Sequence, residues 1–174
     1  MDWSKYFTYC ATTGSVIRKA LPMDMFASRR AYARANKMFA GKTSGHKLYR
    51  RGGQKHCIQV SLFKKEYQAH IIVWELTHGV VPKGMVIDHI DGDPFNNLIS
   101  NLRLATPSQN AMNARKHKPN RSGVKGVTVE GGKYRASIRK NYKAIALGTF
   151  ETLEQARAAR EQGERIHHGE FAPR

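Results

Sequence analysis

The chain has 174 residues, with 30 Lys and Arg against 13 Asp and Glu, which gives a formal net charge of +17. Such a charge calls for a polyanionic partner, and nucleic acid is the natural one because each neutralised phosphate releases counterions. A membrane surface is the weaker alternative, since no long amphipathic basic helix stands out. Two cysteines without a CxxC pair, Cys10 and Cys57, argue against a disulfide framework or a cysteine-based zinc site.

The N-terminal residues lack the apolar segment of a signal peptide, and no apolar run approaches the roughly 18 to 20 residues of a transmembrane helix. We therefore expect a cytoplasmic location and no membrane partner. Around Thr12-Thr13-Gly14, aromatic or apolar residues alternate with polar ones, which predicts a small β-hairpin. Residues 23–38 are rich in Ala and Arg and predict either a helix or a mobile basic arm.

A strand and a helix are predicted between residues 52 and 79. Residues 56–63 alternate apolar and polar side chains, which is typical of a strand, and Gly52-Gly53 before them indicates a hairpin turn. Residues 64–79 predict an amphipathic helix closed by Gly79. Its apolar positions follow the spacing i, i+3, i+4, i+7: Ala69, Ile72, Val73 and Leu76.

A short apolar strand at 85–87 leads into a turn-rich loop, and a second helix follows. Thr106 fits the N-cap of that helix, Pro107 fits its first position, and Gln109 completes a capping box. The polar, basic stretch 117–123 contains Pro119 and Gly123 and reads as a linker.

The last 50 residues have a different pattern. Two strand-like runs are joined by Gly131-Gly132, a third run covers 143–150, and a helix covers 152–166 with Thr152 and Gln155 as a second capping box. Small residues on one helix face would let it lie close on a sheet. That face comprises Leu153, Ala156, Ala159, Gly163 and Ile166. Three antiparallel strands and one helix form an α+β module.

Acidic and amide side chains, with one histidine, are concentrated in the loop region between these parts. They are Asp88, His89, Asp91, Asp93, Asn96, Asn97, Asn101 and Asn110. A plain polar turn is the simple interpretation, because Asp, Asn and Gly are common turn residues. The alternative is phosphodiester hydrolysis, in which histidine takes a proton from water and a divalent ion on oxygen ligands neutralises developing charge. Asp88 and His89 are neighbours in an extended segment, so their side chains would point to opposite sides.

The ordered string decides between the two interpretations. "DHIDGDPFNN" at 88–97, followed by "NLR" at 101–103 and "QN" at 109–110, resembles the HNH endonucleases, in particular the asparagine-rich phage and intron-encoded homing branch. The three name-giving positions map onto His89, Asn101 and Asn110. The resemblance implies a ββα-metal nuclease core in which Asp88 and Asn110 bind the metal and His89 is the general base.

The same resemblance implies further roles. Asn101 would brace the loop and help orient His89, and the catalytic set is thus His89 and Asn101. The expected metal is Mg²⁺ or Mn²⁺, because the same oxygen ligands suit both, and no zinc is expected. His70 occupies the place of a histidine in the helix before the motif. It would either contact DNA or the site, or be a histidine at the edge of the core. Cations placed to meet phosphates are Arg103, Arg115, Lys116 and Lys118.

A DNA-facing sheet is predicted in the C-terminal part. Tyr134, Ala136 and Ile138 alternate with residues that would form the exposed face: Lys133, Arg135, Ser137 and Arg139. A sheet face of this kind can lie in a major groove, although a solvated polar face is the alternative. With "LGTF" at 147–150 and the alanine-rich helix, residues 124–174 resemble the Apetala-type DNA-binding domain of ethylene-response factors. Tyr134 stands where that family has a tryptophan.

These observations predict an α+β chain whose ββα-metal nuclease core precedes a three-stranded antiparallel sheet with one helix. The expected parts are 1–50, a β-hairpin and basic arm; 51–116, the nuclease; 117–123, a basic linker; and 124–174, the DNA-binding domain. The expected function is a homing-type endonuclease acting on double-stranded DNA, with no obligate protein partner. The alternatives are an inactive DNA-binding regulator built on the same domains and an RNA-binding or packaging protein.

Overall fold

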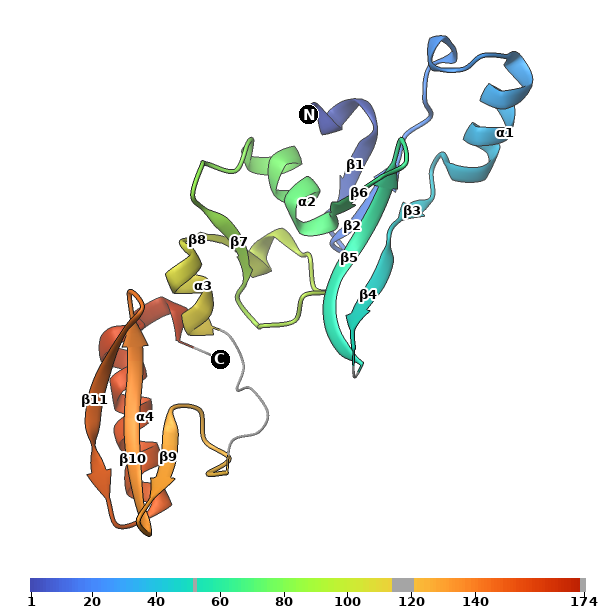
Figure 1. Cartoon of the computed structure of the whole chain (residues 1–174). Helices are drawn as coiled ribbons and strands as arrows, with labels where there is room; N and C mark the ends of the chain where they lie inside the picture. Colours follow the sequence, from blue (N-terminus) through green and yellow to red (C-terminus); the bar gives the residue numbers. More distant parts are fainter. Residues whose placement is uncertain (52, 114–120, 173–174) are drawn as a thin grey trace. The chain divides into compact units, whose positions relative to one another are not determined.

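The structure, a computed structural model, describes residues 1–51, 53–113 and 121–172, and Figure 1 labels their helices and strands. Two units are described separately. The first comprises Met1–Lys83 and Asp93–Leu104, and the second comprises Gly84–Gly92 and Ala105–Arg174. Within the described ranges, no helix combines the length and apolar character needed to cross a membrane.

The first unit begins with the predicted hairpin, which is confirmed. After the short helix η1 (Trp3–Lys5), β1 (Phe7–Cys10) pairs antiparallel with β2 (Ser15–Arg18), which in turn pairs with β3 (Thr43–Ser44). Gly14 in the turn has φ +70°, and a Cβ there would lie 2.6 Å from the backbone nitrogen of Leu98. Only glycine therefore allows this hairpin to approach the 97–98 backbone so closely.

Residues 23–38 adopt the helical alternative from residue 29 onward. The short helix η2 (Met23–Met25) precedes α1 (Arg29–Phe39), whose N-cap Ser28 accepts a hydrogen bond from the backbone of Ala31. Asn36 holds the helix by bonding both the N–H and the C=O of Leu21 at 2.9 Å. No side chain of α1 is fully buried, so this helix is an exposed, basic element between β2 and β3.

A second sheet contains β4 (His46–Arg50), β5 (Gln54–Leu62) and β6 (Lys65–Gln68), and α2 (Ala69–His78) follows it. The prediction of a helix from residue 64 was wrong for residues 65–68. Phe63 and Lys64 both have positive φ, 50° and 61°, and form a tight turn that brings Lys65 opposite Leu62. The strand pairing of β6 thus replaces the first helical turn, and the helix begins at Ala69.

Residues 84–113 contain two short strands and a helix. They are β7 (Val86–His89), β8 (Leu102–Ala105), which the short helix η3 (Ile99–Asn101) precedes, and α3 (Pro107–Asn113). The capping box of α3 is confirmed, since Thr106 Oγ1 accepts from the N–H of Gln109 and Gln109 Oε1 accepts from the N–H of Thr106. The strand predicted at 85–87 is found one residue later, at Val86–His89, so Met85 lies outside it while Asp88 and His89 belong to it.

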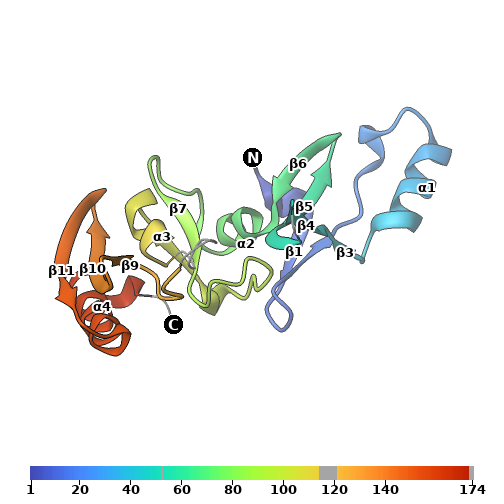
Figure 2. The same ribbon diagram turned by 60° about the horizontal axis from the view of Figure 1, so that its bottom comes forward.

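The C-terminal module is a three-stranded antiparallel sheet covered by one helix, as predicted (Figure 1, Figure 2). Its core contains Val127, Ala136 and Ala156. The helix has its predicted capping box of Thr152 and Gln155. The elements are β9 (Val127–Glu130), β10 (Lys133–Lys140), β11 (Lys143–Phe150), α4 (Leu153–His167) and the short helix η4 (Gly169–Phe171).

The face of α4 that meets the sheet differs from the predicted one in two positions. Ile166 is 66% exposed, whereas Arg160 is only 4% exposed. Arg160 shares the inner face because it lies four residues after Ala156 and three before Gly163, and its charge is paired with Glu164. A Cβ on Gly163 would lie 2.7 Å from the Leu147 side chain, so the small residue does permit close packing on β11.

Candidate functional site

Asp88 and His89 occupy the end of β7, and both are buried, with 4% and 9% exposure. Successive residues of a strand point to opposite sides, so the two side chains lie in different surroundings. Beside them, Val86 packs on a small apolar cluster of Ala105, Met112 and Phe171. This cluster anchors β7 and α3 together, because Val86 belongs to the strand and Met112 to the helix.

Asn113, the last residue of α3, fixes the position of Asp88. Its Nδ2 group donates to both carboxylate oxygens of Asp88, at 3.0 and 3.2 Å, and to the backbone carbonyl of His89 at 2.7 Å. Asn113 is 5% exposed. One side-chain amide therefore orients the carboxylate and the adjoining peptide at once, and its bonds to the carboxylate are of the stronger, charge-assisted kind.

Sequence reasoning missed Asn113, although a signal was present. It lies three residues after Asn110, and residues three apart in a helix are neighbours on one side. The two asparagines differ in exposure, since Asn110 is exposed and Asn113 is buried. The pair thus offers one amide to orient Asp88 and one that reaches solvent.

The residues fit a site for a hard divalent cation. The Asp88 carboxylate and the Asn110 amide carbonyl are oxygen donors, which Mg²⁺ and Mn²⁺ prefer. In the ranges 1–51, 53–113 and 121–172, no group of three or more His, Cys, Asp or Glu side chains is arranged to hold a metal. A site built here would therefore depend on amide, water and phosphate oxygens in addition to one carboxylate.

Lys125 of the C-terminal module supports the end of α3. Its Nζ donates to the carbonyl of Met112 at 2.7 Å, one residue before the end of the described part of α3. Burial lowers the pKa of Lys125, and the neighbouring Arg160 lowers it further. The residue next to Met112 is Asn113, so this contact fixes the backbone of the residue whose side chain holds Asp88, an arrangement called the Asn113 clamp below.

In the first unit, Asn101 braces the loop that follows Asp93. Its Nδ2 donates to the backbone carbonyl of Asn96 at 2.9 Å. The hydroxyl of Tyr9 accepts from the N–H of Ile99 at 2.9 Å and ties the same segment to β1. A bracing contact of this kind is what the resemblance implied for Asn101, while the orientation of His89 by Asn101 stays a prediction.

The predicted basic face of β10 exists, and its alternation is confirmed, since Ala136 and Ile138 are buried and the neighbouring cations are exposed. Two of its cations meet carboxylates, one on the neighbouring strand β9 and one directly after β11. Lys133 lies 2.6 Å from Glu151, and Arg135 lies 3.7 Å from Glu130. Exposed pairs of this kind are weak, so a phosphate can compete for either cation. Ser137 is half-buried and Arg139 is exposed.

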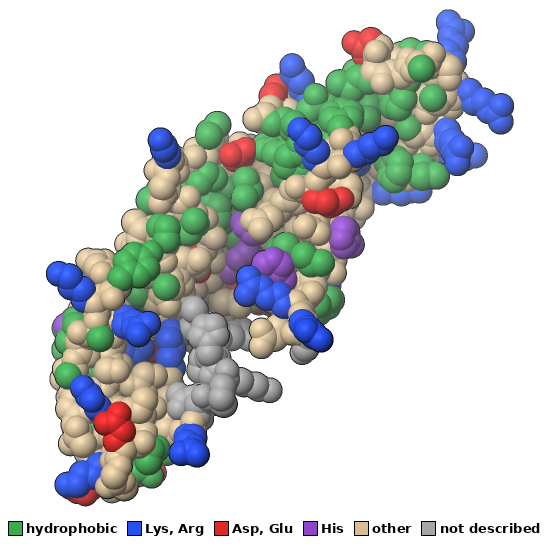
Figure 3. Space-filling view, viewed as in Figure 1, with side chains coloured by type: hydrophobic (Ala, Val, Ile, Leu, Met, Phe, Trp, Pro, Cys, Tyr) green, Lys and Arg blue, Asp and Glu red, His purple; other side chains and the backbone are tan. Residues whose placement is uncertain are grey.

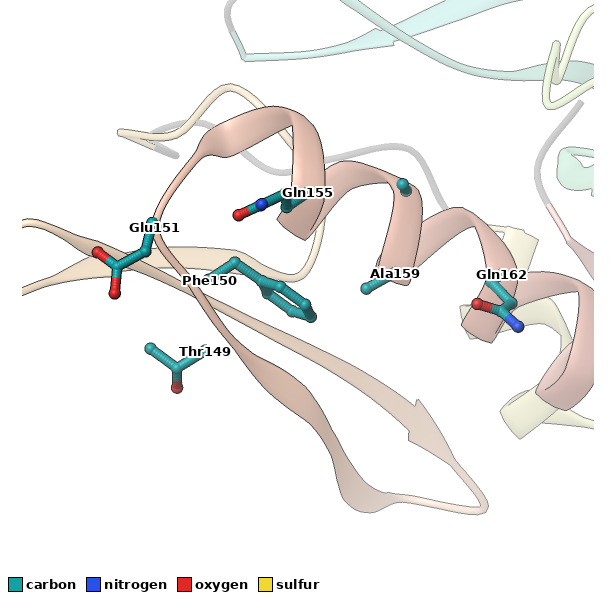
Figure 4. Close-up of a pocket in the computed structure, with 7 residues that line it drawn as sticks. Thr149, Phe150, Glu151, Gln155, Ala159 and Gln162 are labelled. Atoms are coloured by element: carbon teal, nitrogen blue, oxygen red, sulfur yellow. The ribbon is translucent and has the colours of Figure 1, made fainter.

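The remaining candidate residues are distributed differently. His70 in α2 and Arg103 in β8 are half-buried. Arg115, Lys116 and Lys118 lie outside the described residues, so their predicted contacts with phosphates stay predictions. A shallow hollow between β11 and α4, lined by Phe150, Gln155 and Ala159 among others, carries Glu151 and none of the residues of 88–113 (Figure 4). It is therefore separate from the candidate site.

The comparisons with known proteins cover the part of the chain that carries the motif. Residues 67–112 match the family model described as HNH endonuclease, so the chain carries an HNH endonuclease domain. Protein 3.8 of Escherichia phage T7 is 50% identical over 66 residues, which cover 38% of this chain and 54% of that protein. An HNH endonuclease of Acanthamoeba polyphaga mimivirus, described as uncharacterized, is 38% identical over 90 residues, 51% of this chain and 46% of that protein.

A more distant relative is YosQ of Bacillus subtilis, a prophage-derived protein described as a candidate HNH homing endonuclease. It is 38% identical over 52 residues, 30% of each chain. The chain thus spans about half the length of the first two relatives. No solved structure matches. The matches do not identify the C-terminal module as an Apetala-type domain. HNH nucleases generally use a divalent metal ion and act on DNA.

Proposed function

Because residues 67–112 form an HNH endonuclease domain, we propose that this protein is a homing-type endonuclease that hydrolyses phosphodiester bonds of double-stranded DNA. His89 is its general base, and Asp88 and Asn110 hold one divalent ion. The C-terminal module and the cations near the motif hold the duplex. The protein acts in the cytoplasm of the host cell.

His89 removes a proton from the attacking water. A neutral imidazole suits this task, because one of its ring nitrogens is free of a proton and can accept one. Its backbone carbonyl is bonded to Asn113, so the peptide that carries the base is held in one orientation. Asn101 keeps the following loop in shape through its bond to Asn96.

Asp88 presents a carboxylate whose orientation Asn113 sets before DNA arrives. A bound divalent ion, Mg²⁺ or Mn²⁺, would neutralise the charge that develops on the phosphate and on the leaving 3′ oxygen. Asn110 offers the amide oxygen on the solvent side of α3. The single observation that carries the proposal is the Asn113 clamp, because it brings Asp88, His89 and α3 into one arrangement.

DNA binding is assigned to the basic surfaces on either side of the motif. On β10, the residues in contact are Lys133, Arg135, Ser137 and Arg139, in the manner of an Apetala-type sheet. Arg103, Arg115, Lys116 and Lys118 meet phosphates beside the cut, and His70 is a further contact. Supporting this is the excess of cations, 30 Lys and Arg against 13 Asp and Glu. Affinity for DNA should fall steeply with salt.

The test is cleavage of supercoiled plasmid carrying phage genomic fragments, with Mg²⁺ or with EDTA. Wild type is compared with His89→Ala and with His167→Ala, a matched histidine at the end of α4. Loss of the general base should slow cutting by at least about 100-fold, whereas His167→Ala should cut like wild type. Equal activity of His89→Ala and wild type would refute the base assignment. Tight binding without cutting in any metal would favour the inactive regulator.

A further inference from the structure

The β4–β5 hairpin is a cationic ribbon that the nuclease motif does not include. Tyr49 beside the cations is 52% exposed. Figure 1 shows β4 and β5 running side by side toward the turn that joins them. Four exposed cations belong to the two strands and their turn: Lys47, Arg50, Arg51 and Lys55.

One face of this hairpin meets a side chain from the acidic loop. The Nζ atoms of Lys47 and Lys55 lie 5.2 and 5.3 Å from the centroid of the Phe95 ring. The ring of Tyr49 meets the same ring edge-on at 5.2 Å. Lys55 also pairs with Asp93 at 2.5 Å. The loop that continues the nuclease motif is thus bound to the hairpin by a ring, two cations and a carboxylate.

The strand register explains why these side chains converge. Tyr49 lies directly opposite Lys55, and Lys47 lies two residues before Tyr49 on the same face of β4. A register shift between Leu48 and Tyr49 separates this pair from the pairing of Leu48 with Cys57. The convergence is therefore built into the hairpin and does not depend on chance side-chain positions.

The charges in this group do not balance. Two ammonium groups approach one aromatic ring, and Asp93 supplies one carboxylate. Like charges near one ring repel each other, while the attraction of each to the ring opposes that repulsion. Arg50 and Arg51 add two further cations at the turn. An anion placed along this edge would relieve the repulsion, and the phosphates of a duplex form such a row of charges.

Along the chain, Asp93 follows His89 by four residues, a span of at most about 14 Å when fully extended. Chain connectivity alone therefore sets this upper limit on the distance between the Cα atoms of Asp93 and His89. A duplex whose cut phosphate meets the water activated by His89 carries further phosphates along its backbone, and one of these is the partner proposed for this group.

We propose that the β4–β5 hairpin is a DNA-binding arm in which Lys47, Lys55, Arg50 and Arg51 contact backbone phosphates next to the cut. The arm is held to the catalytic loop through Phe95 and Asp93. A two-stranded ribbon has the dimensions to follow a groove of duplex DNA. This inference rests on the proposed nuclease function and adds a second region of substrate contact outside the HNH motif and the C-terminal sheet.

The test uses the full chain and a duplex DNA, with binding measured by fluorescence anisotropy in EDTA over a salt titration. The double variant Arg50→Gln, Arg51→Gln is compared with Arg29→Gln, Arg30→Gln in α1, an equal loss of charge from another exposed element. Each lost phosphate contact lowers the salt slope by about one, so the hairpin variant should lose about two. Its affinity at moderate salt should fall at least about tenfold, while the α1 variant keeps the wild-type slope.

Three results would overturn the proposal that the β4–β5 hairpin is a DNA-binding arm. The first is a hairpin variant that binds like wild type, and the second is an equal loss in both double variants, which would assign binding to the total charge. The third is competition by duplex RNA as effective as that by DNA. Circular dichroism of all variants establishes that they fold alike. Plasmid cutting by wild type with Mg²⁺, measured in parallel, reports separately on the nuclease function.

The anchoring role of Phe95 has its own test. Phe95→Leu keeps an apolar side chain but removes the ring that both lysines approach. Its Kd for DNA should rise several-fold with the salt slope almost unchanged, because the cations remain but their positions are no longer set. A Phe95→Leu variant with wild-type affinity would show that the contacts of the Phe95 ring do not position the arm.

Discussion

Helices α3 and α4 begin with the same chemistry and serve different purposes. Each starts at a threonine that caps a glutamine three residues later, and both capping boxes are closed. α3 has 7 residues and carries Asn110 and Asn113, whereas α4 has 15 and packs on a sheet. The shared cap therefore marks where each helix begins and says nothing about what it does.

The two helices are stabilised by different means. The described part of α3 is short, and two side-chain contacts hold it: Lys125 bonds to the carbonyl of Met112, and Asn113 bonds to Asp88. α4 depends on its inner face, where small residues lie close to the sheet and Arg160 is buried. The helix with the candidate site residues, α3, is thus held by a few hydrogen bonds. The helix that covers the sheet, α4, is held mainly by packing of its inner face.

The largest expected effect comes from the buried cation of α4. Arg160→Met leaves Glu164 mostly buried without its partner and the carbonyl of Ser137 without its donor, 3.0 Å away. The free energy of unfolding should fall by about 3 kcal/mol or more. Arg157→Met on the exposed face should change it by less than about 0.5 kcal/mol. Chemical denaturation measures both, and equal losses would contradict the assigned packing face.

Breaking the polar clamp of α3 should affect activity more than folding. Asn113→Ala removes the donor to both Asp88 oxygens and to the carbonyl of His89. Misplacement of the site by about 1 Å costs about 100-fold in rate, so plasmid cutting should fall by that factor. Gln162→Ala, an exposed amide on α4, is the control and should cut normally. If Asn113→Ala cut plasmid at the wild-type rate, the Asn113 clamp would have no part in the mechanism.

The paired caps give a direct comparison of the two helices. Thr106→Ala and Thr152→Ala should each lower the free energy of unfolding by about 1 kcal/mol. Plasmid cutting should fall several-fold only for Thr106→Ala, because α3 carries Asn110 and Asn113. Denaturation and cutting rates are measured on the same preparations. If both variants lost activity alike, the stated division of labour between the helices would be wrong.

The smallest effect is a pH dependence at the end of α4. Burial holds the pKa of His168 below its ordinary value, and Arg160 and Lys125 add to this, while the bond to the Arg139 carbonyl and Glu164 oppose it. The unfolded chain then binds the proton at higher pH than the folded one. Stability is therefore full above about pH 6.5 and falls as the pH drops toward the folded pKa.

The measurement is the unfolding midpoint between about pH 8 and about pH 5. His168→Gln keeps a donor to the Arg139 carbonyl and should flatten the decline over this range. An unchanged slope in the variant would mean that other groups cause it.

Much of this protein could be predicted from local sequence. The strands of the C-terminal module, both capping boxes and the Thr12-Thr13-Gly14 hairpin follow from turn residues, alternation and caps, which act over a few residues. The motif at 88–110 pointed to the HNH domain because the family is defined by these residue types at this spacing along the sequence. The net charge predicted a polyanionic partner for the same reason, since charge needs no fold to be counted.

Other features were decided by the tertiary structure. Residues 65–68 joined β5 as a strand, because pairing with a neighbouring strand outweighed the helical pattern. Arg160 replaced Ile166 on the inner face of α4, because Glu164 and the Ser137 carbonyl satisfy its charge. Asn113 became the clamp of Asp88, and Phe95 the anchor of the β4–β5 hairpin, through contacts between residues distant in sequence. A linear pattern contains no distance between such residues, and only folding brings them together.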